Sequence, residues 1–226
     1  MFTVRDIVTS TVLMLCSYAC LNGCRSDSIS NPSSLESVPQ IDAGNFVSGI
    51  VFNWPVGRTA TLVAWNARGI NEGFTLGKGQ ILSNGYFRVH LNKPPSTYLS
   101  PVFGLGCPGY INVSDSAAQM LSGYVVFDVI GDSTNDYTFG SIVFQDSSEW
   151  VLSDSGQFQT WFVYSTSPVM AEGMGFCADE NIVYNYVFRE GWNILYSVVT
   201  KETPTLQITE TMSLPKRGIW VYFPSL

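Results

Sequence analysis

The stretch GFTLGKGQILSNGYFRVHL, residues 73–91, carries the clearest secondary-structure signal in the chain. Asn84-Gly85 separates two apolar runs, and this dipeptide is the strongest short-range signal for a β-hairpin, because both residues of the tightest turn need positive φ angles. Residues 87–91 then alternate between apolar and polar side chains, with Arg88 and His90 in the polar positions. This alternation predicts a strand with one buried side and one side facing solvent.

The same pattern extends in both directions from this stretch. Runs rich in Val, Ile, Tyr, Phe and Trp are separated by turn residues, and no stretch keeps a helical period. Glu190-Gly191 lies between two such runs and predicts a second hairpin over 188–193. We therefore expect an all-β fold made of one or two packed antiparallel β-sandwich units. The predicted strands are 46–54, 59–65, 73–82, 86–91, 123–131, 139–146, 157–165, 181–188, 192–199, 205–212 and 218–223.

Composition narrows the class of protein. The chain has 226 residues, of which 46% are hydrophobic and 14% aromatic, so it can bury a substantial core. Charged residues make up 13%, about half the usual quarter. The net charge of −7 argues against nucleic acid as a partner, and a single histidine excludes most zinc sites and most His-based catalysis.

The N-terminal segment is typical of a secretory signal. An apolar run of 15 residues, 7–21, follows Arg5. A membrane-spanning helix needs about 20 apolar residues, whereas this length suits the hydrophobic region of a signal peptide. We expect a signal peptide over residues 1–23.

The run ends in Leu21-Asn22-Gly23-Cys24, which resembles the lipobox of bacterial lipoproteins. Leu21, Gly23 and Cys24 match that pattern, and Asn22 departs from its usual small residue. The resemblance implies that the signal is cut before Cys24 and that this cysteine carries a covalent diacylglyceryl lipid. The alternative is an ordinary secretory signal followed by a chance cysteine.

The resemblance also implies a location. In that family an Asp directly after the lipidated cysteine retains the protein on the inner membrane, and here Arg25 occupies the position. We therefore expect an exported protein anchored by lipid to the bacterial cell envelope, at the outer membrane or the cell surface. Residues 24–45, rich in Ser, Asn and Pro, would form the lipidated N-terminus and a flexible tether.

The first part of the body, 46–104, contains four short motifs that belong together. They are Ser48-Gly49-Ile50-Val51, Ala64 at the end of an apolar strand, Gly77-Lys78-Gly79 and Asn84-Gly85-Tyr86-Phe87. In these motifs it resembles the small β-sandwich modules of the carboxypeptidase-regulatory or transthyretin-like kind, and the resemblance implies a non-catalytic module. The rest, 105–226, is expected to be a second β-rich module, either separate from the first or continuous with it.

Cysteine counting predicts a disulfide bond. Of five cysteines, Cys16 and Cys20 leave with the signal and Cys24 is lipidated. Cys107 and Cys177 remain, and in an oxidising compartment two remaining cysteines imply one bridge. The alternative is a pair of buried free thiols.

Charges are segregated along the chain. Residues 46–93 contain five basic residues and one acidic residue, whereas 94–188 contain ten acidic residues and no Lys or Arg. The two regions could attract one another, or the second could form an acidic face that attracts cations. Chance in a weakly charged chain is a third explanation.

Two kinds of binding site are open. Asp128, Asp132, Asn135 and Asp136 gather in the base-free stretch and could offer oxygen ligands to calcium, although the same residue types are ordinary turn formers. Exposed Trp and Tyr side chains can stack on sugars. The candidates here are Trp54 and Trp150, because they lie nearest to turns.

No catalytic residue stands out. His90 falls on the polar side of its predicted strand, and we expect the acidic residues to lie mostly at turns, where water keeps their pKa values ordinary. We therefore expect no enzyme and no cofactor besides the lipid and the calcium candidate. The leading hypothesis is a structural or protein-interaction module anchored to the membrane. The alternative is a lipid-anchored module that binds a glycan or small ligand.

Overall fold

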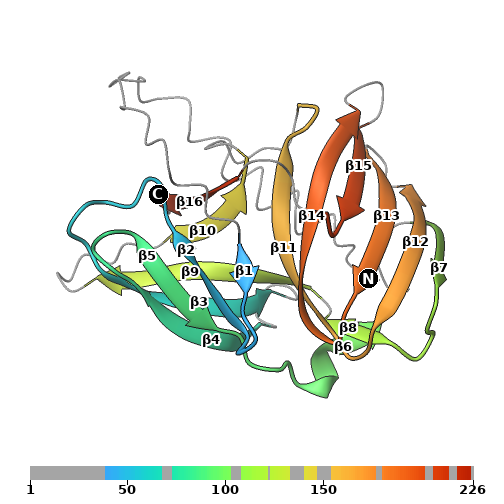
Figure 1. Ribbon diagram of the computed structural model, residues 1–226, viewed down its shortest axis with the longest axis horizontal. Coiled ribbons are helices and arrows are strands. Elements are labelled where there is room, and N and C mark those ends of the chain that lie inside the picture. The colour runs from blue at the N-terminus through green and yellow to red at the C-terminus, as the bar shows by residue number, and fades with distance from the viewer. Residues whose placement is uncertain are drawn as a thin grey trace.

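The computed structural model describes residues 39–67, 73–102, 108–121, 123–132, 140–146, 154–176, 180–201, 206–213 and 218–224. These residues form strands joined by turns, with one short 3₁₀ helix at Ser96–Tyr98 (Figure 1). The expectation of an all-β fold is confirmed. The strands are β1 (Gln40–Ile41), β2 (Phe46–Ile50), β3 (Ala60–Ala67), β4 (Phe74–Ile81), β5 (Tyr86–His90), β6 (Leu99–Pro101), β7 (Gly109–Val113), β8 (Gln119–Leu121), β9 (Tyr124–Asp132), β10 (Gly140–Gln145), β11 (Phe158–Ser165), β12 (Val169–Phe176), β13 (Glu180–Phe188), β14 (Gly191–Lys201), β15 (Leu206–Thr211) and β16 (Ile219–Pro224).

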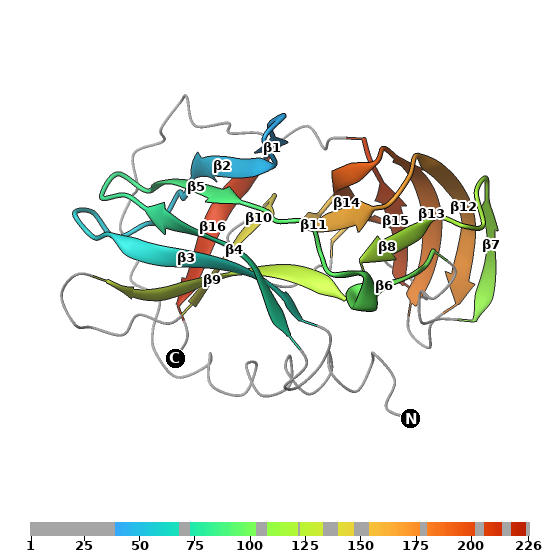
Figure 2. The ribbon, with the colours of Figure 1, turned by 90° about the horizontal axis from the view of Figure 1, so that it is seen from below.

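All of these strands belong to one hydrogen-bonded sheet, which curls into two halves (Figures 1 and 2). Its order is β1-β2-β5-β4-β3-β9-β10-β11-β14-β15-β13-β12-β7, with β16 on β10, β8 on β11 and β6 on β8. The pairings are antiparallel except for β13 with β15 and a bridge between Val51 and Trp220. Because β9 pairs with β3, the sequence ranges 46–104 and 105–226 share this sheet.

Trp220 lies at the centre of the hydrophobic core in the first half. Its side chain is fully buried. Ring centroids lie 4.8 Å away at Phe87 of β5, 5.9 Å at Phe127 of β9 and 5.6 Å at Phe144 of β10, all edge-on. Phe162 of β11 stacks on the indole at 6.2 Å and 17°. The last described strand therefore supplies the side chain around which four other strands pack.

A second hydrophobic core fills the other half of the sheet, and β11 and β14 contribute to both cores. In each strand alternate side chains face opposite ways. Phe162 and Trp192 enter the first core, whereas Val163 and Leu195 enter the second. These two strands are accordingly apolar on both faces, as a buried partition must be.

The hairpin between β4 and β5 forms as predicted, but through a different turn. Residues 87, 89 and 91 are fully buried and Arg88 is exposed, which confirms the predicted faces. Gly85 N–H donates to Leu82 O at 2.8 Å, and Leu82 N–H donates to Tyr86 O at 2.8 Å. Only Gly85 of the Asn-Gly pair has a positive φ, at 81°. The loop is therefore a type I turn followed by a left-handed glycine, and the two-residue turn expected from Asn84-Gly85 is wrong.

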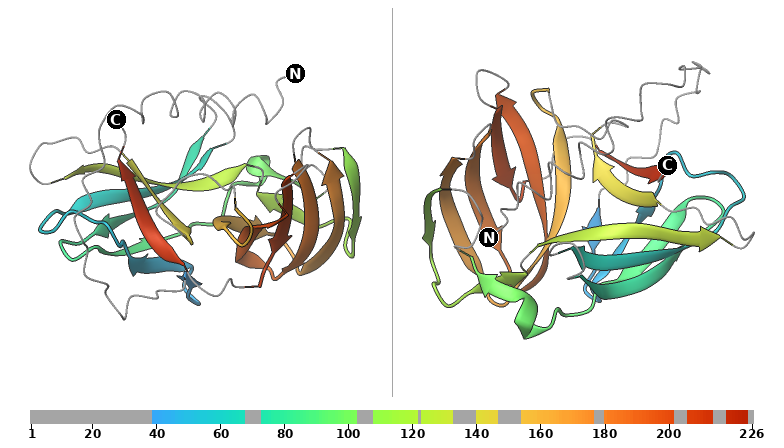
Figure 3. Two further views of the ribbon diagram at one scale, coloured as in Figure 1. Left: turned by 90° about the horizontal axis from the view of Figure 1, so that it is seen from above. Right: turned by 180° about the vertical axis from the view of Figure 1, so that it is seen from behind.

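The second predicted hairpin is wrong in its pairing. The chain does turn at Glu190-Gly191, where Gly191 has a φ of 93°, but β15 lies between β13 and β14 (Figures 1 and 3). The tip is closed by Asn193, whose side chain accepts from Arg189 N–H at 3.0 Å and donates to Arg189 O at 2.9 Å. β15 therefore enters as a wedge between two strands that remain joined at the tip.

Removing the central indole should destabilise the whole sheet. We expect Trp220→Ala to lower the free energy of unfolding by about 3–5 kcal/mol, because it empties a site lined by four aromatic rings. Phe176→Ala is the matched control, since that ring is 48% exposed on β12 and its loss should cost less than about 1 kcal/mol. Urea unfolding followed by circular dichroism measures both, and similar losses in the two variants would contradict the central role of Trp220.

Candidate functional site

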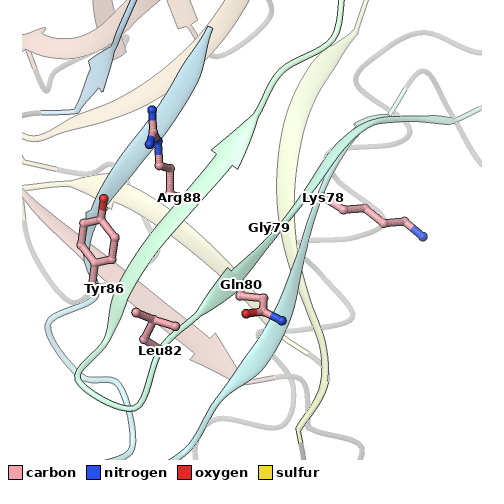
Figure 4. A pocket seen from close by; sticks show the side chains of 6 residues that line it. All are labelled: Lys78, Gly79, Gln80, Leu82, Tyr86 and Arg88. Atoms are coloured by element: carbon pink, nitrogen blue, oxygen red, sulfur yellow. The ribbon is translucent and has the colours of Figure 1, made fainter. Parts of the chain in front are cut away.

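A shallow hollow of about 470 Å³ lies on the outer face of β4 and β5 (Figure 4). Gln80 pairs with Arg88 across the two strands, so their side chains share this face. In Figure 4, Lys78 points away from Arg88 and Tyr86. The polar side chains diverge, and the hollow is an open dish above Gly79. Its lining residues are Lys78, Gly79, Gln80, Leu82, Tyr86 and Arg88.

Arg88, the main cation of this dish, is already engaged within the chain. Its guanidinium lies 3.9 Å from the centre of the Phe46 ring and forms an ion pair with Asp42 at 2.9 Å. The Asp42 carboxylate also accepts the backbone N–H groups of Phe46 and Gly44 at 3.0 and 2.8 Å. These hydrogen bonds, led by that of Phe46, lower the pKa of Asp42, so its carboxylate stays ionised to a lower pH than an ordinary aspartate. An incoming anion would have to compete with this carboxylate.

A second hollow, of about 250 Å³, lies over β3 and β9 and has the carboxyl group of Asp128 in its wall. Asp128 Oδ2 accepts from Trp65 Nε1 at 2.5 Å, and Oδ1 accepts from Ser141 Oγ at 2.8 Å. Burial raises the pKa of Asp128, while these two hydrogen bonds act in the opposite direction. A half-buried indole beside a carboxyl group is suited to a ligand with one apolar and one polar side, such as a sugar ring. The other lining residues are Val63, Gly73, Phe74, Thr75 and Ile130.

Glu210 forms a third polar cluster, where β15 enters between β13 and β14. Glu210 is paired with Tyr184 on one side and with Ser197 on the other. Its carboxyl group accepts from the hydroxyl of Tyr186 and, at 3.4 Å, from Ser197 Oγ. Ser197 Oγ in turn accepts from Trp161 Nε1 at 2.8 Å. The carboxyl group thus bridges the two strands that β15 separates.

Burial sets the protonation of this cluster. Loss of contact with water raises the pKa of Glu210, although its two hydrogen bonds act against the shift. Burial, and then the charge of Glu210, raise the pKa of Tyr184 to about 12 and that of Tyr186 as well. Both tyrosines are therefore neutral near pH 7, and Tyr186 remains a donor to the carboxyl group. Glu210 therefore links β13 and β14 through its hydrogen bonds with Tyr186 and Ser197.

The carboxyl groups of Asp128 and Glu210 correct the expectation that the acidic residues lie mostly at turns with ordinary pKa values. Asp128 lies within β9 and Glu210 within β15. Both are partly withdrawn from water among the neighbouring strands, and this burial raises both pKa values.

The structure tests one of the two tryptophans that were predicted to be exposed for sugar binding. The expected exposure of Trp54 is wrong, because only 8% of the residue is accessible. Its ring packs edge-on against Tyr222 at 5.2 Å, and Nε1 donates to Arg58 O at 3.0 Å. Trp150 lies outside the described residues. Trp65, which was not among the candidates, lines a hollow together with the carboxyl group of Asp128.

Of the four calcium candidates, only Asp128 has a side chain in the described part of the chain. Both oxygens of Asp128 are used by Trp65 and Ser141. The side chain of Asp132, together with Asn135 and Asp136, lies outside the described residues. Within the described ranges no group of three or more His, Cys, Asp or Glu side chains comes together. Calcium binding stays a prediction.

The comparisons with known proteins add no relative. Family models, curated proteins and solved structures were all compared with this chain, and none matches. Among the described residues, no helix has the length and apolar character needed to cross a bilayer. Cys24 lies outside the described residues, so its lipidation stays a prediction.

Sequence reasoning missed the Glu210 cluster, although a signal was present. Residues 205–212 were predicted as a strand, and in a strand every second side chain shares a face. Ile208 is buried, so Glu210 had to occupy the same covered side. An acidic residue at an inward strand position is the pattern that identifies such a group.

The disulfide prediction rests on cysteines that also lie outside the described residues, but their neighbours are informative. Phe176 N–H donates to Pro108 O at 2.7 Å, and these residues directly precede Cys177 and follow Cys107. Each cysteine is one peptide unit, about 3.8 Å between Cα atoms, from a residue of that pair. We expect unfolded, unreduced protein to contain no free thiol at Cys107 or Cys177 and reduction to release two. Mass spectrometry after alkylation checks this, and full alkylation before reduction would contradict the bridge.

The raised pKa of Glu210 predicts a dependence of stability on pH. The folded protein retains a proton on Glu210 above the ordinary glutamate pKa of about 4.3, so the free energy of unfolding falls as pH rises from that value through the folded pKa. Glu210→Gln should remove this loss, which amounts to about 1.4 kcal/mol for each pH unit over which the proton is kept. Urea unfolding between about pH 4 and pH 8 measures it. Glu172→Gln, at an exposed position of β12, is the control and should leave the pH profile unchanged.

Proposed function

We propose that this protein is a lipoprotein of the bacterial cell envelope, which holds a non-catalytic β body at the membrane and acts through protein contacts. The observation that carries the proposal is Leu21-Asn22-Gly23-Cys24 at the end of a signal-like run. Two or more acyl chains on such a terminus anchor a protein almost permanently. The end of the predicted tether at residue 45 is wrong, because Gln40–Ile41 form β1 against β2 and Asp42 pairs with Arg88. The part of 24–45 that can separate the lipid from the body therefore ends before residue 40.

Features of the body support a role in contact. Most of the described tryptophan and phenylalanine rings are used in the two cores, as the rings around Trp220 illustrate. The dish over Gly79 has diverging polar groups, and its cation is paired with Asp42. The two buried carboxyl groups are each held by hydrogen bonds to neighbouring strands. This arrangement favours a rigid displayed surface over a site for chemistry.

The lipid anchor has a direct test. Cells expressing the full chain and fed an alkyne-tagged palmitate should incorporate label into the wild-type protein, and Cys24→Ala should lose the label and leave the membrane fraction. Cys20→Ala is the matched control, because Cys20 lies in the same segment but lacks the preceding Leu of a lipobox, and it should keep the label. Equal labelling of wild type and Cys24→Ala would contradict the proposal.

A second function, glycan or small-ligand binding, is favoured by one observation. The hollow over β3 and β9 combines the half-buried indole of Trp65 with the carboxyl group of Asp128. If a sugar binds there, its addition should change the Trp65 fluorescence of the purified protein, and Asp128→Asn should weaken binding while keeping the fold. In-cell crosslinking of the anchored protein separates the two functions, because protein adducts support the first and glycan adducts the second.

A further inference from the structure

The two ends of the sheet are protected to very different degrees. At one end, β1 has two residues and is followed by the ion pair of Asp42 with Arg88. At the other end, β7 runs for five residues, Gly109–Val113, without a charged residue or a proline (Figures 1 and 2). Edge strands are ordinarily blunted by shortness, by charge or by proline, because their unpaired backbone groups can pair with another chain. β7 has none of these protections.

The hydrogen-bond pattern shows which backbone groups of β7 face outward. Phe176 N–H donates to Pro108 O at 2.7 Å, and Ser114 N–H donates to Met170 O at 2.9 Å. In an antiparallel pair the hydrogen-bonded positions alternate. The even-numbered residues of β7 therefore bond to β12, and the N–H and C=O groups of 109, 111 and 113 point to the other side. Among the described strands, none pairs with that side of β7.

The side chains next to this edge are apolar and exposed. On the outer face Tyr110 of β7 is 57% exposed, and on the next two strands Met170 and Val187 are 57% and 60% exposed. Met170 and Val187 are opposite one another across β12 and β13, whereas Tyr110 lies beside Met174, nearer the other end of β12. Tyr110 is thus the exposed apolar side chain on the edge strand itself. On the inner face Ile111 packs against the second core, which holds the strand in place.

We propose that β7 pairs in antiparallel fashion with β7 of a second copy of this chain, about a two-fold axis at Ile111. This register places Ile111 opposite Ile111 and Gly109 opposite Val113 of the second copy, so every outward N–H meets an outward C=O. On the outer face Tyr110 lies opposite Asn112 of the second copy.

Charge favours a second copy as the occupant. The chain carries a net charge of −7, so most contacts between two copies bring like charges together. The strand 109–113 contains no charged residue, so its pairing with a second copy brings no like charges together. The nearest described acid on its outer face, Glu172, lies on β12, one strand back from the edge. The pairing is self-complementary, as a two-fold interface must be.

How far the protein dimerises in the cell rests on the proposed function, because the lipid anchor brings the copies together. Five paired residues bury much less than the roughly 1,600 Å² of a standard interface, so the association is weak in free solution. A lipid anchor confines the copies to a surface and raises their effective concentration. The test therefore reaches high concentration without depending on the lipid.

Sedimentation equilibrium of the full chain, in a detergent matched to the solvent density, measures the association directly. We expect wild type to dimerise as its concentration is raised towards about 1 mM. Tyr110→Lys with Asn112→Lys places like charges opposite one another in the dimer and should weaken association at least about tenfold. Both side chains are exposed, and the pairing with β12 uses backbone groups, so the melting temperature should change little.

A second double variant tests the register. Tyr110→Glu with Asn112→Lys places Glu opposite Lys at both ends of the antiparallel pair, and association should return to the wild-type level or exceed it. A parallel pairing in register would set Glu against Glu and Lys against Lys, and would not be rescued. The two double variants share Asn112→Lys, so the contrast isolates the sign of the charge at residue 110.

Several results would overturn the proposal. A wild type that stays monomeric over the whole range rules out self-association. A dimer that is unaffected by Tyr110→Lys with Asn112→Lys lies elsewhere on the surface, and equal weakening by both double variants excludes the two-fold pairing. Any of these results leaves the acyl labelling at Cys24 as it was, so failure here is distinct from failure of the proposed anchor.

Discussion

The packing of aromatic rings around Trp220 is the interaction on which the rest of the structure depends. Its indole comes from β16, and it gathers rings from β5, β9, β10 and β11, which are scattered along the sequence. Gly49 of β2 lies directly against the same indole, where a Cβ atom would come within 2.4 Å of Nε1. β16 also joins β10 and bridges to Val51, so the indole is held while the sheet curls around it. The first core therefore closes only when the last described strand is in place.

Local patterns were enough to predict eleven of the sixteen described strands, because the alternation of side chains in a half-buried strand is written within a few residues. The strands that were not predicted are β1, β6, β7, β8 and β12. β5 shows this, since residues 87–91 fall on the predicted faces. The predicted hairpin at Glu190-Gly191 failed because β15, from further along the chain, lies between its two strands. Trp54 follows a turn-rich loop yet is buried, because Tyr222 comes back from the other end of the chain to cover it.

The candidate sites were less predictable for the same reason. Asp128 and Trp65 are 63 residues apart in the sequence and meet only because β3 pairs with β9. Glu210 meets Tyr186 and Ser197 only because β15 separates β13 from β14. Each of these groups was visible in the sequence as a residue type, but its chemistry comes from its neighbours. The lipid and disulfide predictions rest on a motif and on counting, and they stay predictions.

The wedge of β15 has a consequence for the order of events during folding. β13 and β14 are joined by a short turn and leave the ribosome before β15, so they can meet first as a direct hairpin on the microsecond scale. In the native sheet that contact is replaced by a parallel pairing of β13 with β15 and an antiparallel pairing of β15 with β14. A hairpin formed in this way would have to open from its free end, with Asn193 holding the tip closed as it does in the native structure. If β13 and β14 pair first, this part of the sheet is complete only after β15 has inserted, and Glu210 meets Tyr186 and Ser197 at that step.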